Sequence, residues 1–358
     1  MAKKLRYGIA GCGGIAGGKY LPVIRKIDNV EICAFCDVIP ALAEKANAEY
    51  GGGKGKVFTD YRELVKEDLD AVMVLTPNST HCEITVAALE AGKHVMCEKP
   101  MAINYKEAKA MIAARDKSGK LLTVGYQNRY RPDSLYLKAE CDSGALGDIY
   151  FARATAIRRR AVPTWGVFLN EKMQGGGPLI DIGTHALDLT LFMMNNYEPL
   201  YAVGTAYHKF NKEKNTGNAW GDWDTDKFTV EDSAFGFIVM KNNAAIILQS
   251  SWALNTTEEK EAVTTLCGTK AGADMPVAGE LVINGVKNGR RYTCTPDFKT
   301  GASTLKDSEL EALTFAQAIR GKGKLCVRAE EAAVVTRILE GIYISAKTGK
   351  PFYFKDEK

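Results

Sequence analysis

Apolar runs and helical patterns alternate over the first 125 residues of the chain. The apolar runs predict strands at residues 5–10, 30–36, 57–58, 71–75, 93–97 and 121–124. Apolar positions at helical spacing predict helices between them, at about 16–27, 40–50, 61–66, 79–91 and 104–119. Strands that alternate with helices in this way indicate an α/β fold with a doubly wound parallel sheet.

The pattern changes in the rest of the chain. Strand-like segments follow one another with few helices between them, at 149–160, 200–207, 228–240, 244–252 and 262–267. Turn-forming residues at 241–243 and 268–272 indicate hairpins. Helices are expected from the Gly175-Gly176-Gly177-Pro178 turn to about Met194, and near the end at 308–319 and 329–346. This order indicates an antiparallel or mixed sheet, and helices on one face would leave the other face to a partner subunit.

Length and capping signals refine this outline. A chain of 358 residues is longer than most domains that have a single hydrophobic core, so we expect two domains, residues 1–125 and 126–358. The sequences Asn104-x-x-Glu107 and Ser308-x-x-Glu311 are both read as capping boxes that start helices.

Composition argues against several classes of function. The net charge of +4 is spread along the chain, which favours neither a nucleic acid nor a membrane surface as partner. Apolar runs are too short to span a bilayer, and residues 1–4 enter a strand rather than a signal-peptide core, so a cytoplasmic location is expected. The nine scattered cysteines suit a reducing compartment. Cys33 and Cys36 point to opposite faces of a strand, which argues against a redox or metal pair.

The first strand leads into Gly11-x-Gly13-x-x-Ala16 and a helix. In such a unit the first glycine takes the tight turn, the second lets backbone approach a pyrophosphate, and the small third residue allows close packing. Asp37 ends the next strand, where an acid binds a ribose 2′-hydroxyl. No arginine follows Asp37 directly, so NAD is favoured over NADP.

Polar residues follow the other parallel strands, and ligands of such sheets bind beyond the carboxyl ends of the strands. One crevice is therefore expected to collect Gly11, Asp37, Thr76, Glu98 and Gln127. The neighbours Tyr126 and Asn128 are expected to line it too.

Two further groups suit hydride removal from a carbinol, which needs a proton acceptor and a charge that stabilises the alkoxide. Lys99 lies at a strand end, where an ammonium group could bond the reacting hydroxyl. Asp181 and His185 are four residues apart, so on a helix the carboxylate can orient and charge-stabilise the imidazole. Asp188 lies on the same helical face as Asp181 and His185. Two aspartates and one histidine are too few ligands for a metal site, so no metal is expected.

Several motifs together resemble the glucose-fructose oxidoreductase and inositol dehydrogenase family (Gfo/Idh/MocA). They are Gly11-Cys12-Gly13-Gly14-Ile15-Ala16, Thr76-Pro77-Asn78-Ser79-Thr80-His81, Glu98-Lys99-Pro100, and Gly175 to His185 with its Asp-x-x-x-His element. The resemblance implies an N-terminal Rossmann domain that binds NAD(P). It also implies a C-terminal α/β domain with an open, mostly antiparallel sheet for substrate binding and oligomerisation, often paired in homodimers or homotetramers.

The resemblance also implies roles for residues. Lys99, Asp181 and His185 fall on the family's catalytic positions. The expected cofactor contacts are Gly11, Gly13, Gly14, Ile15, Asp37, Thr76, Pro77, Asn78, His81, Glu98, Lys99 and Gln127. The expected substrate contacts are Lys99, Tyr126, Asn128, Arg158, Trp165, Asp181 and His185. Trp220 and Trp223 fit either a sugar-stacking loop or a packed loop.

Three functions fit these residues. The leading hypothesis is an NAD-dependent dehydrogenase acting on a carbinol of a sugar, sugar acid or inositol. A second is a glycosidase or epimerase that reduces and reoxidises a tightly bound NAD within one turnover. A third is a dinucleotide-binding regulator without catalysis, against which the intact Lys99, Asp181 and His185 argue.

Overall fold

The computed structural model describes residues 3–277, 279–298 and 305–355, and the chain forms two compact units. The first unit comprises Met1–Tyr130 and Thr304–Ala333, and the second comprises Arg131–Ser303 and Val334–Lys358. The first unit thus extends slightly beyond the boundary expected after residue 125. It also includes the segment Thr304–Ala333, which was expected in the second domain.

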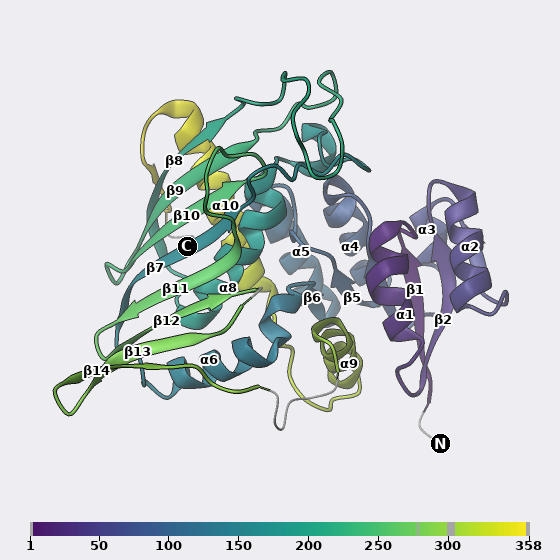
Figure 1. Cartoon of the computed structure of the whole chain (residues 1–358). Helices are drawn as coiled ribbons and strands as arrows, with labels where there is room; N and C mark the ends of the chain where they lie inside the picture. Colours follow the sequence, from purple (N-terminus) through teal and green to yellow (C-terminus); the bar gives the residue numbers. More distant parts are fainter. Residues whose placement is uncertain (1–2, 278, 299–304, 356–358) are drawn as a thin grey trace. The chain divides into compact units, whose positions relative to one another are not determined.

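The first unit contains a six-stranded parallel sheet in the order β3-β2-β1-β4-β5-β6 (Figure 1). Its strands are β1 (Leu5–Ala10), β2 (Val30–Cys36), β3 (Lys56–Phe58), β4 (Ala71–Val74), β5 (His94–Cys97) and β6 (Leu122–Val124). The reversal of strand order beside β1 confirms the doubly wound Rossmann sheet.

The helices of this unit follow the predicted positions closely. They are η1 (Ala16–Tyr20), α1 (Leu21–Ile24), α2 (Pro40–Tyr50), α3 (Tyr61–Leu64), η2 (Asn78–Thr80), α4 (His81–Glu90), α5 (Tyr105–Ser118), η3 (Gln127–Tyr130) and α9 (Asp307–Ile319). The helix expected at 16–27 is a π-helical turn followed by a short α-helix, and it ends at Ile24.

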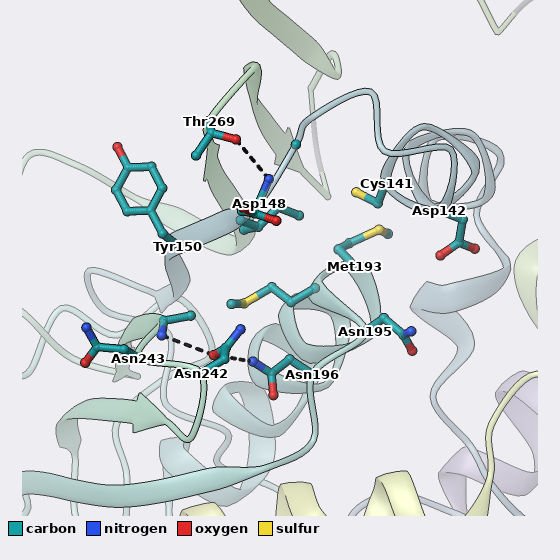
Figure 2. A pocket seen from close by; sticks show the side chains of 14 residues that line it. Cys141, Asp142, Asp148, Tyr150, Met193, Asn195, Asn196, Asn242, Asn243 and Thr269 are labelled. Carbon is teal, nitrogen blue, oxygen red and sulfur yellow. Dashed lines mark hydrogen bonds between the residues drawn. The ribbon is translucent and has the colours of Figure 1, made fainter.

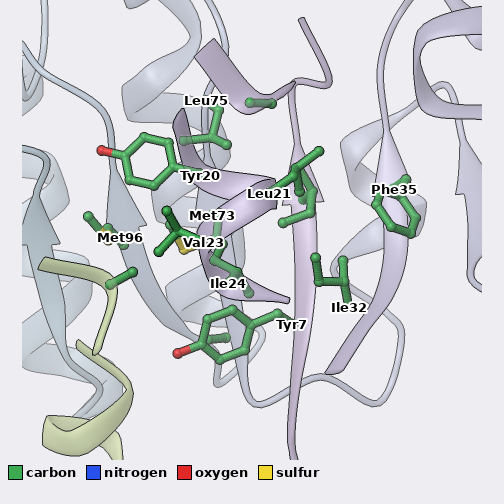
Figure 3. Packing of buried hydrophobic residues seen from close by; sticks show 14 of the residues in the cluster. Tyr7, Tyr20, Leu21, Val23, Ile24, Ile32, Phe35, Met73, Leu75 and Met96 are labelled. Carbon is green, nitrogen blue, oxygen red and sulfur yellow. The ribbon is translucent and has the colours of Figure 1, made fainter. Parts of the chain in front are cut away.

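Helix α9 belongs to the first unit because its apolar face completes that core. Phe315 lies edge-on to Tyr7 of β1, with ring centroids 6.1 Å apart. Ala312 and Ala316 join the same cluster of buried residues from β1, α1, β2, β4 and β5 (Figure 3). Burial of this face supplies the stability that keeps α9 on the sheet.

The second unit contains a nine-stranded sheet in the order β14-β13-β12-β11-β7-β10-β9-β8-β15. Its strands are β7 (Ile149–Ile157), β8 (Pro199–Tyr207), β9 (Ser233–Met240), β10 (Ala245–Ser251), β11 (Lys260–Gly268), β12 (Ala271–Pro276), β13 (Val282–Lys287), β14 (Arg290–Cys294) and β15 (Phe352–Tyr353). Only β7 and β10 pair in parallel, which confirms the mostly antiparallel sheet.

Helices cover one face of this sheet (Figure 1). The helices of this unit are α6 (Pro132–Asp142), α7 (Glu171–Gln174), η4 (Leu179–Gly183), α8 (Thr184–Met194) and α10 (Ala329–Thr348). Ile342 of α10 packs against Gly204 and Gly236, where a Cβ atom would lie 2.6 and 2.5 Å from its side chain. On the other face, Val203 and Phe237 pair in register and remain 39% and 41% exposed.

Two sequence expectations were wrong in detail. The strand expected at 228–240 begins only at Ser233, because the backbone of Thr229 bonds to Leu169 and the Glu231 side chain bonds to another turn. The Ser308-x-x-Glu311 capping box does not form: Glu309 accepts from the Lys306 N–H instead, and Glu311 is buried. None of the helices in the described part of the chain combines the length and apolarity needed to cross a membrane.

Candidate active site

The loop after β1 is shaped by its glycines. Gly11 has φ +92°, and a Cβ there would lie 2.5 Å from the Leu75 carbonyl oxygen, so only glycine fits without strain. At Gly13 and Gly14 a Cβ would meet no atom within 4 Å. The loop therefore leaves open room beside its backbone, which is what a bound pyrophosphate requires. Ala16 is fully buried beneath it.

Asp37 is held at the end of β2 by the same loop. Its carboxylate accepts from the Cys12 N–H at 2.8 Å and from the Ile39 N–H at 2.9 Å. Val38 and Ile39 are exposed, at 85% and 55%. The acid is thus fixed beside the glycine loop, with two exposed apolar side chains directly after it, in a position where an acid can bind a ribose hydroxyl.

The segment after β4 is organised by His81. Its ring nitrogens lie 2.9 Å from the Thr76 carbonyl and 2.8 Å from the Pro100 carbonyl, and the ring is fully buried. Burial lowers the pKa of this imidazole. His81 therefore links two strand ends, and its full burial favours a structural role over contact with a cofactor. Pro77 and Asn78 are partly exposed in the turn between these bonds.

A buried charge cluster lies at the ends of β5 and β6. The Lys19 ammonium is 2.8 Å from Glu98 Oε1, 2.9 Å from Gln127 Oε1 and 3.6 Å from Glu311 Oε2. The Tyr20 hydroxyl donates to Glu98 Oε1 at 2.7 Å. The other Glu98 oxygen accepts from the Lys99 N–H at 2.9 Å. The cluster thereby fixes the backbone that carries Lys99.

The two carboxyl groups of this cluster have opposite pKa shifts. Burial alone would raise the pKa of Glu98, but the charges of Lys19 and Lys99 and the hydrogen bonds outweigh it and hold the pKa at about 2. Burial raises the pKa of Glu311 to about 7, because Lys19 only partly offsets it and Glu98 adds repulsion. Glu98 is thus ionised at neutral pH, whereas Glu311 is poised to titrate.

The residues expected beside Lys99 differ in accessibility. Lys99, Gln127 and Asn128 are partly exposed, whereas Tyr126 is fully buried. The burial of Tyr126 favours a packing role over contact with a substrate.

In the second unit, Asp181 lies in η4 and His185 follows in the first turn of α8. Both side chains are partly exposed. The indole N–H of Trp252 donates to Asp181 Oδ2 at 3.1 Å, which fixes the carboxylate. Asp188 is fully buried on the same helix.

Glu231 holds the turn that leads to Asp181. Its buried carboxyl group accepts from the backbone N–H groups of Gly177 and Leu179, at 2.8 and 3.2 Å, and from the Tyr343 hydroxyl at 2.7 Å. Burial raises its pKa to about 7 in spite of these bonds. The carboxyl group thus satisfies the orphan N–H groups at the start of η4.

Arg158 and Trp165 both follow β7 in the chain. Arg158 forms an ion pair with Glu261, and its guanidinium lies 5.3 Å from the ring centroid of Trp220. Trp165 is 52% exposed and lies edge-on to Trp220. Trp223 is only 5% exposed and packs on Phe228, so it belongs to a packed loop.

Within the first unit, the structure brings some of the expected residues together. The glycine loop joins Asp37, and Lys19 joins Glu98 to Gln127, all in the first unit. The second unit contains Asp181, His185, Arg158 and Trp165, whereas Lys99 belongs to the first unit.

Sequence reasoning missed Lys19, Glu311 and Tyr343, and it gave Glu231 no role. These residues act through partners far along the chain, such as Glu311 with Lys19. The one local signal was a charged residue inside an apolar helical pattern, at Lys19 and at Glu311.

A separate pocket of about 730 Å³ lies at the carboxyl end of α8 (Figure 2). Asp181 precedes the opposite end of that helix, and none of the expected site residues lines the pocket. Polar groups that line it bond to one another, as Asn196 Nδ2 does to Asn242 Oδ1 at 2.9 Å. Over the described residues, no group of three or more histidine, cysteine or acidic side chains is arranged to hold a metal ion.

The chain is similar to known proteins over almost its full length. Residues 5–126 match the model of an oxidoreductase family with an NAD-binding Rossmann fold, and residues 134–274 match the GFO/IDH/MocA C-terminal domain. D-glucoside 3-dehydrogenase of Escherichia coli (strain K12) is 34% identical over 347 residues, 96% of each chain. Inositol 2-dehydrogenase of Salmonella typhimurium (strain LT2) is 31% identical over 163 residues, 45% of this chain and 48% of that protein.

Solved structures share the fold. A levoglucosan dehydrogenase in complex with NADH and levoglucosan has a TM-score of 0.82 at 21% identity, covering 98% of this chain and 99% of that one. An oxidoreductase domain protein from Kribbella flavida has a TM-score of 0.86 at 20% identity, covering 99% and 100%.

Proposed function

The chain belongs to the GFO/IDH/MocA family of NAD-binding oxidoreductases, and we propose that it is a dehydrogenase that uses NAD to oxidise a carbinol of a sugar, sugar acid or cyclitol. The observation that carries this proposal is the 34% identity to D-glucoside 3-dehydrogenase over 96% of both chains. The partial match to inositol 2-dehydrogenase supports the same class of substrate.

The choice of NAD over NADP is supported by the surroundings of Asp37. Its carboxylate is held by two backbone N–H groups, and the next two side chains are apolar and exposed. A 2′-phosphate would meet a fixed negative charge and no arginine directly after it. Gly11, Gly13, Gly14 and Ile15 would hold the pyrophosphate, with Thr76, Pro77, Asn78, Glu98 and Gln127 at the neighbouring strand ends.

The protein's own residues would handle the substrate hydroxyl. Bound NAD would supply the acceptor for the hydride that leaves the carbinol carbon. The Lys99 ammonium would donate to the reacting oxygen and stabilise its developing charge. An imidazole nitrogen of His185 would accept the hydroxyl proton, and Asp181 would stabilise the resulting imidazolium. Asn128, Arg158 and Trp165 would contribute to substrate binding.

Self-association is supported by the open face of the nine-stranded sheet. Val203, Phe237 and Ile247 are cross-strand neighbours on that face, and the first two are about two-fifths exposed. An apolar face of this kind is suited to a second copy of the chain, so the proposed assembly is a homodimer or homotetramer. All nine cysteines carry free thiols, which supports a reducing compartment such as the cytoplasm.

An absorbance assay tests the proposed function. NAD or NADP is offered with a panel of sugars, sugar acids, glycosides and inositols to the native protein and to Lys99→Ala and His185→Ala. The expected result is NADH formation with NAD, reduced at least about a hundredfold in both variants. A protein that purifies with bound nicotinamide, forms no NADH and yet hydrolyses or epimerises a sugar would contradict the proposal.

A further inference from the structure

Four aromatic side chains of the second unit form a continuous row that starts at Asp181. Trp252 donates its indole N–H to that carboxylate and lies 6.4 Å from Phe168, measured between ring centroids. Phe168 lies 6.0 Å from Trp165, which in turn lies 4.9 Å from Trp220. We call these four residues the aromatic row.

The two outer members of the aromatic row are more exposed than the two inner ones. Trp252 is fully buried, Phe168 is partly exposed, and Trp165 and Trp220 are 52% and 43% exposed. The inner end therefore belongs to the core, whereas the outer end presents two indoles to solvent. Large exposed aromatic side chains that cluster beside charged groups mark binding sites.

The two outer indoles sit on a backbone that is tied in place. The Val162 N–H donates to Asn218 Oδ1 at 2.8 Å, and Asn218 Nδ2 donates to the Val162 carbonyl at 3.0 Å. The Thr164 hydroxyl donates to the Trp220 carbonyl at 2.9 Å. These bonds join the two segments that carry Trp165 and Trp220, so the pair is organised before any ligand arrives. Such preorganisation lowers the entropic cost of binding.

The composition of the outer end fits a sugar ring. An indole offers an apolar surface for the C–H face of a pyranose, whereas hydroxyl groups need polar partners at its rim. Arg158 supplies such a partner, since its guanidinium lies 5.3 Å from the Trp220 ring and pairs with Glu261.

The outer pair is the part of the aromatic row that is farthest from Asp181 along the row. The ring that is oxidised must lie within hydrogen-bond reach of Asp181 and His185, whereas Phe168 and Trp252 separate Trp165 from Asp181 along the aromatic row. We propose that Trp165 and Trp220 form a second subsite, which binds the ring attached to the oxidised sugar, so that two-ring glycosides are preferred over one-ring substrates. This inference rests on the proposed function, because that function places the oxidised ring at Asp181.

Equilibrium binding tests the second subsite independently of turnover. Calorimetry compares methyl glucoside with a glucose disaccharide on the native protein, Trp220→Ala, Trp165→Ala and Trp220→Phe. The native protein is expected to bind the disaccharide about three- to tenfold more tightly. Trp220→Ala should lose this preference while methyl glucoside binding stays unchanged. Trp165→Ala should lose the preference too, and Trp220→Phe should keep part of it. Tyr150→Ala is the control, because Tyr150 is 58% exposed and lies outside the aromatic row.

The possible outcomes separate the two proposals. If the disaccharide preference survives both alanine substitutions, or if both sugars weaken equally, the subsite is wrong. It is also wrong if light scattering shows that Trp220→Ala changes the subunit number without changing the preference, because the pair is then a subunit contact. If the preference is present and lost as expected although no sugar is oxidised, the subsite stands and the dehydrogenase proposal fails. If neither sugar binds the native protein, the second subsite is wrong, and the absorbance panel alone decides the dehydrogenase proposal.

Discussion

Among single residues, Lys19 decides the charge state of its neighbours. Its ammonium is the close countercharge of Glu98 and lies near Glu311, and all three side chains are at most 14% exposed. Removing one partner of a buried pair leaves a charge without compensation, which costs about 3–5 kcal/mol. We therefore expect Lys19→Met to lower the free energy of unfolding in urea by about that amount.

A double variant checks the cause. If the uncompensated Glu98 carboxylate is responsible, Lys19→Met combined with Glu98→Gln should regain a large part of the loss. A Lys19→Met protein within about 0.5 kcal/mol of the native one would show that the cluster carries little stability.

The raised pKa of the Glu231 carboxyl group makes the free energy of unfolding depend on pH. Its folded pKa of about 7 lies above the ordinary value of 4.5, so the folded protein holds a proton that the unfolded chain has released. The resulting stabilisation is complete below about pH 4.5 and is lost as the pH rises through 7. Glu311 contributes with the same sign.

The free energy of unfolding of the native protein should accordingly fall between about pH 5 and 6.5 with a slope of about two protons, and of Glu231→Gln with about one; both slopes should approach zero by about pH 8. Unfolding free energies across this range measure both slopes. Glu258→Gln is the control because Glu258 is exposed. An unchanged slope in Glu231→Gln would refute the assignment.

Asp37 carries the predicted preference between the two dinucleotides. Replacing its carboxylate removes both the ribose acceptor and the repulsion of a 2′-phosphate, so Asp37→Ser should lower kcat/KM with NAD about tenfold or more. Asp37→Ser with Val38→Arg should raise kcat/KM with NADP. Equal use of NAD and NADP by the native protein would contradict the role given to Asp37.

At the scale of elements, two glycines of the loop after β1 have different roles: Gly11 is required by the fold, whereas Gly13 leaves space for the cofactor. Gly11→Ala places a methyl group against the Leu75 carbonyl at φ +92°, so it should cost about 1–3 kcal/mol of stability. Gly13→Ala adds a methyl group in open space, so it should leave stability nearly unchanged but weaken NAD binding.

Thermal unfolding and NADH fluorescence titration distinguish the two variants. Gly13→Ala binding NADH as tightly as the native protein would mean that the cofactor does not approach this loop.

Elements with strong local signals could be predicted from the sequence. Helix α5 starts at the Asn104 cap, where Glu107 N–H donates to Asn104 Oδ1 at 2.9 Å, as its capping box indicates. The hairpin of β13 and β14 also has a local signal, the pair Asn288-Gly289, and both of these residues adopt positive φ in the turn.

Long-range features could not be predicted in the same way. Helix α9 packs on the first unit because Phe315 reaches Tyr7, and that contact joins residues about three hundred positions apart, which local periodicity does not encode. Glu311 is a second example. Its spacing from Ser308 is that of a capping box, but tertiary packing buries its side chain beside Lys19.

At the scale of the whole molecule, the open sheet face predicts the subunit number. Phe237 of β9 lies on that face between Val203 of β8 and Ile247 of β10, with which it pairs. A charge there would be buried without a partner in the proposed assembly. Phe237→Glu should therefore yield smaller particles by light scattering, with the circular dichroism of the native protein.

Leu135→Glu is the matched control, since Leu135 is 42% exposed on α6 rather than on the sheet. A native protein that is monomeric at micromolar concentration would rule out the face as a subunit contact.

The most direct test of the central claim is to follow the hydrogen itself. A glucoside or inositol found active in the absorbance assay is prepared with deuterium on the carbinol carbon and incubated with the protein and NAD. The account predicts that the reduced dinucleotide carries the deuterium, in an amount equal to the ketone formed, and that Lys99→Ala and His185→Ala form neither product. Deuterium that returns to the sugar or passes to water, with no labelled NADH released, would contradict a dehydrogenase and indicate a redox cycle on a retained cofactor.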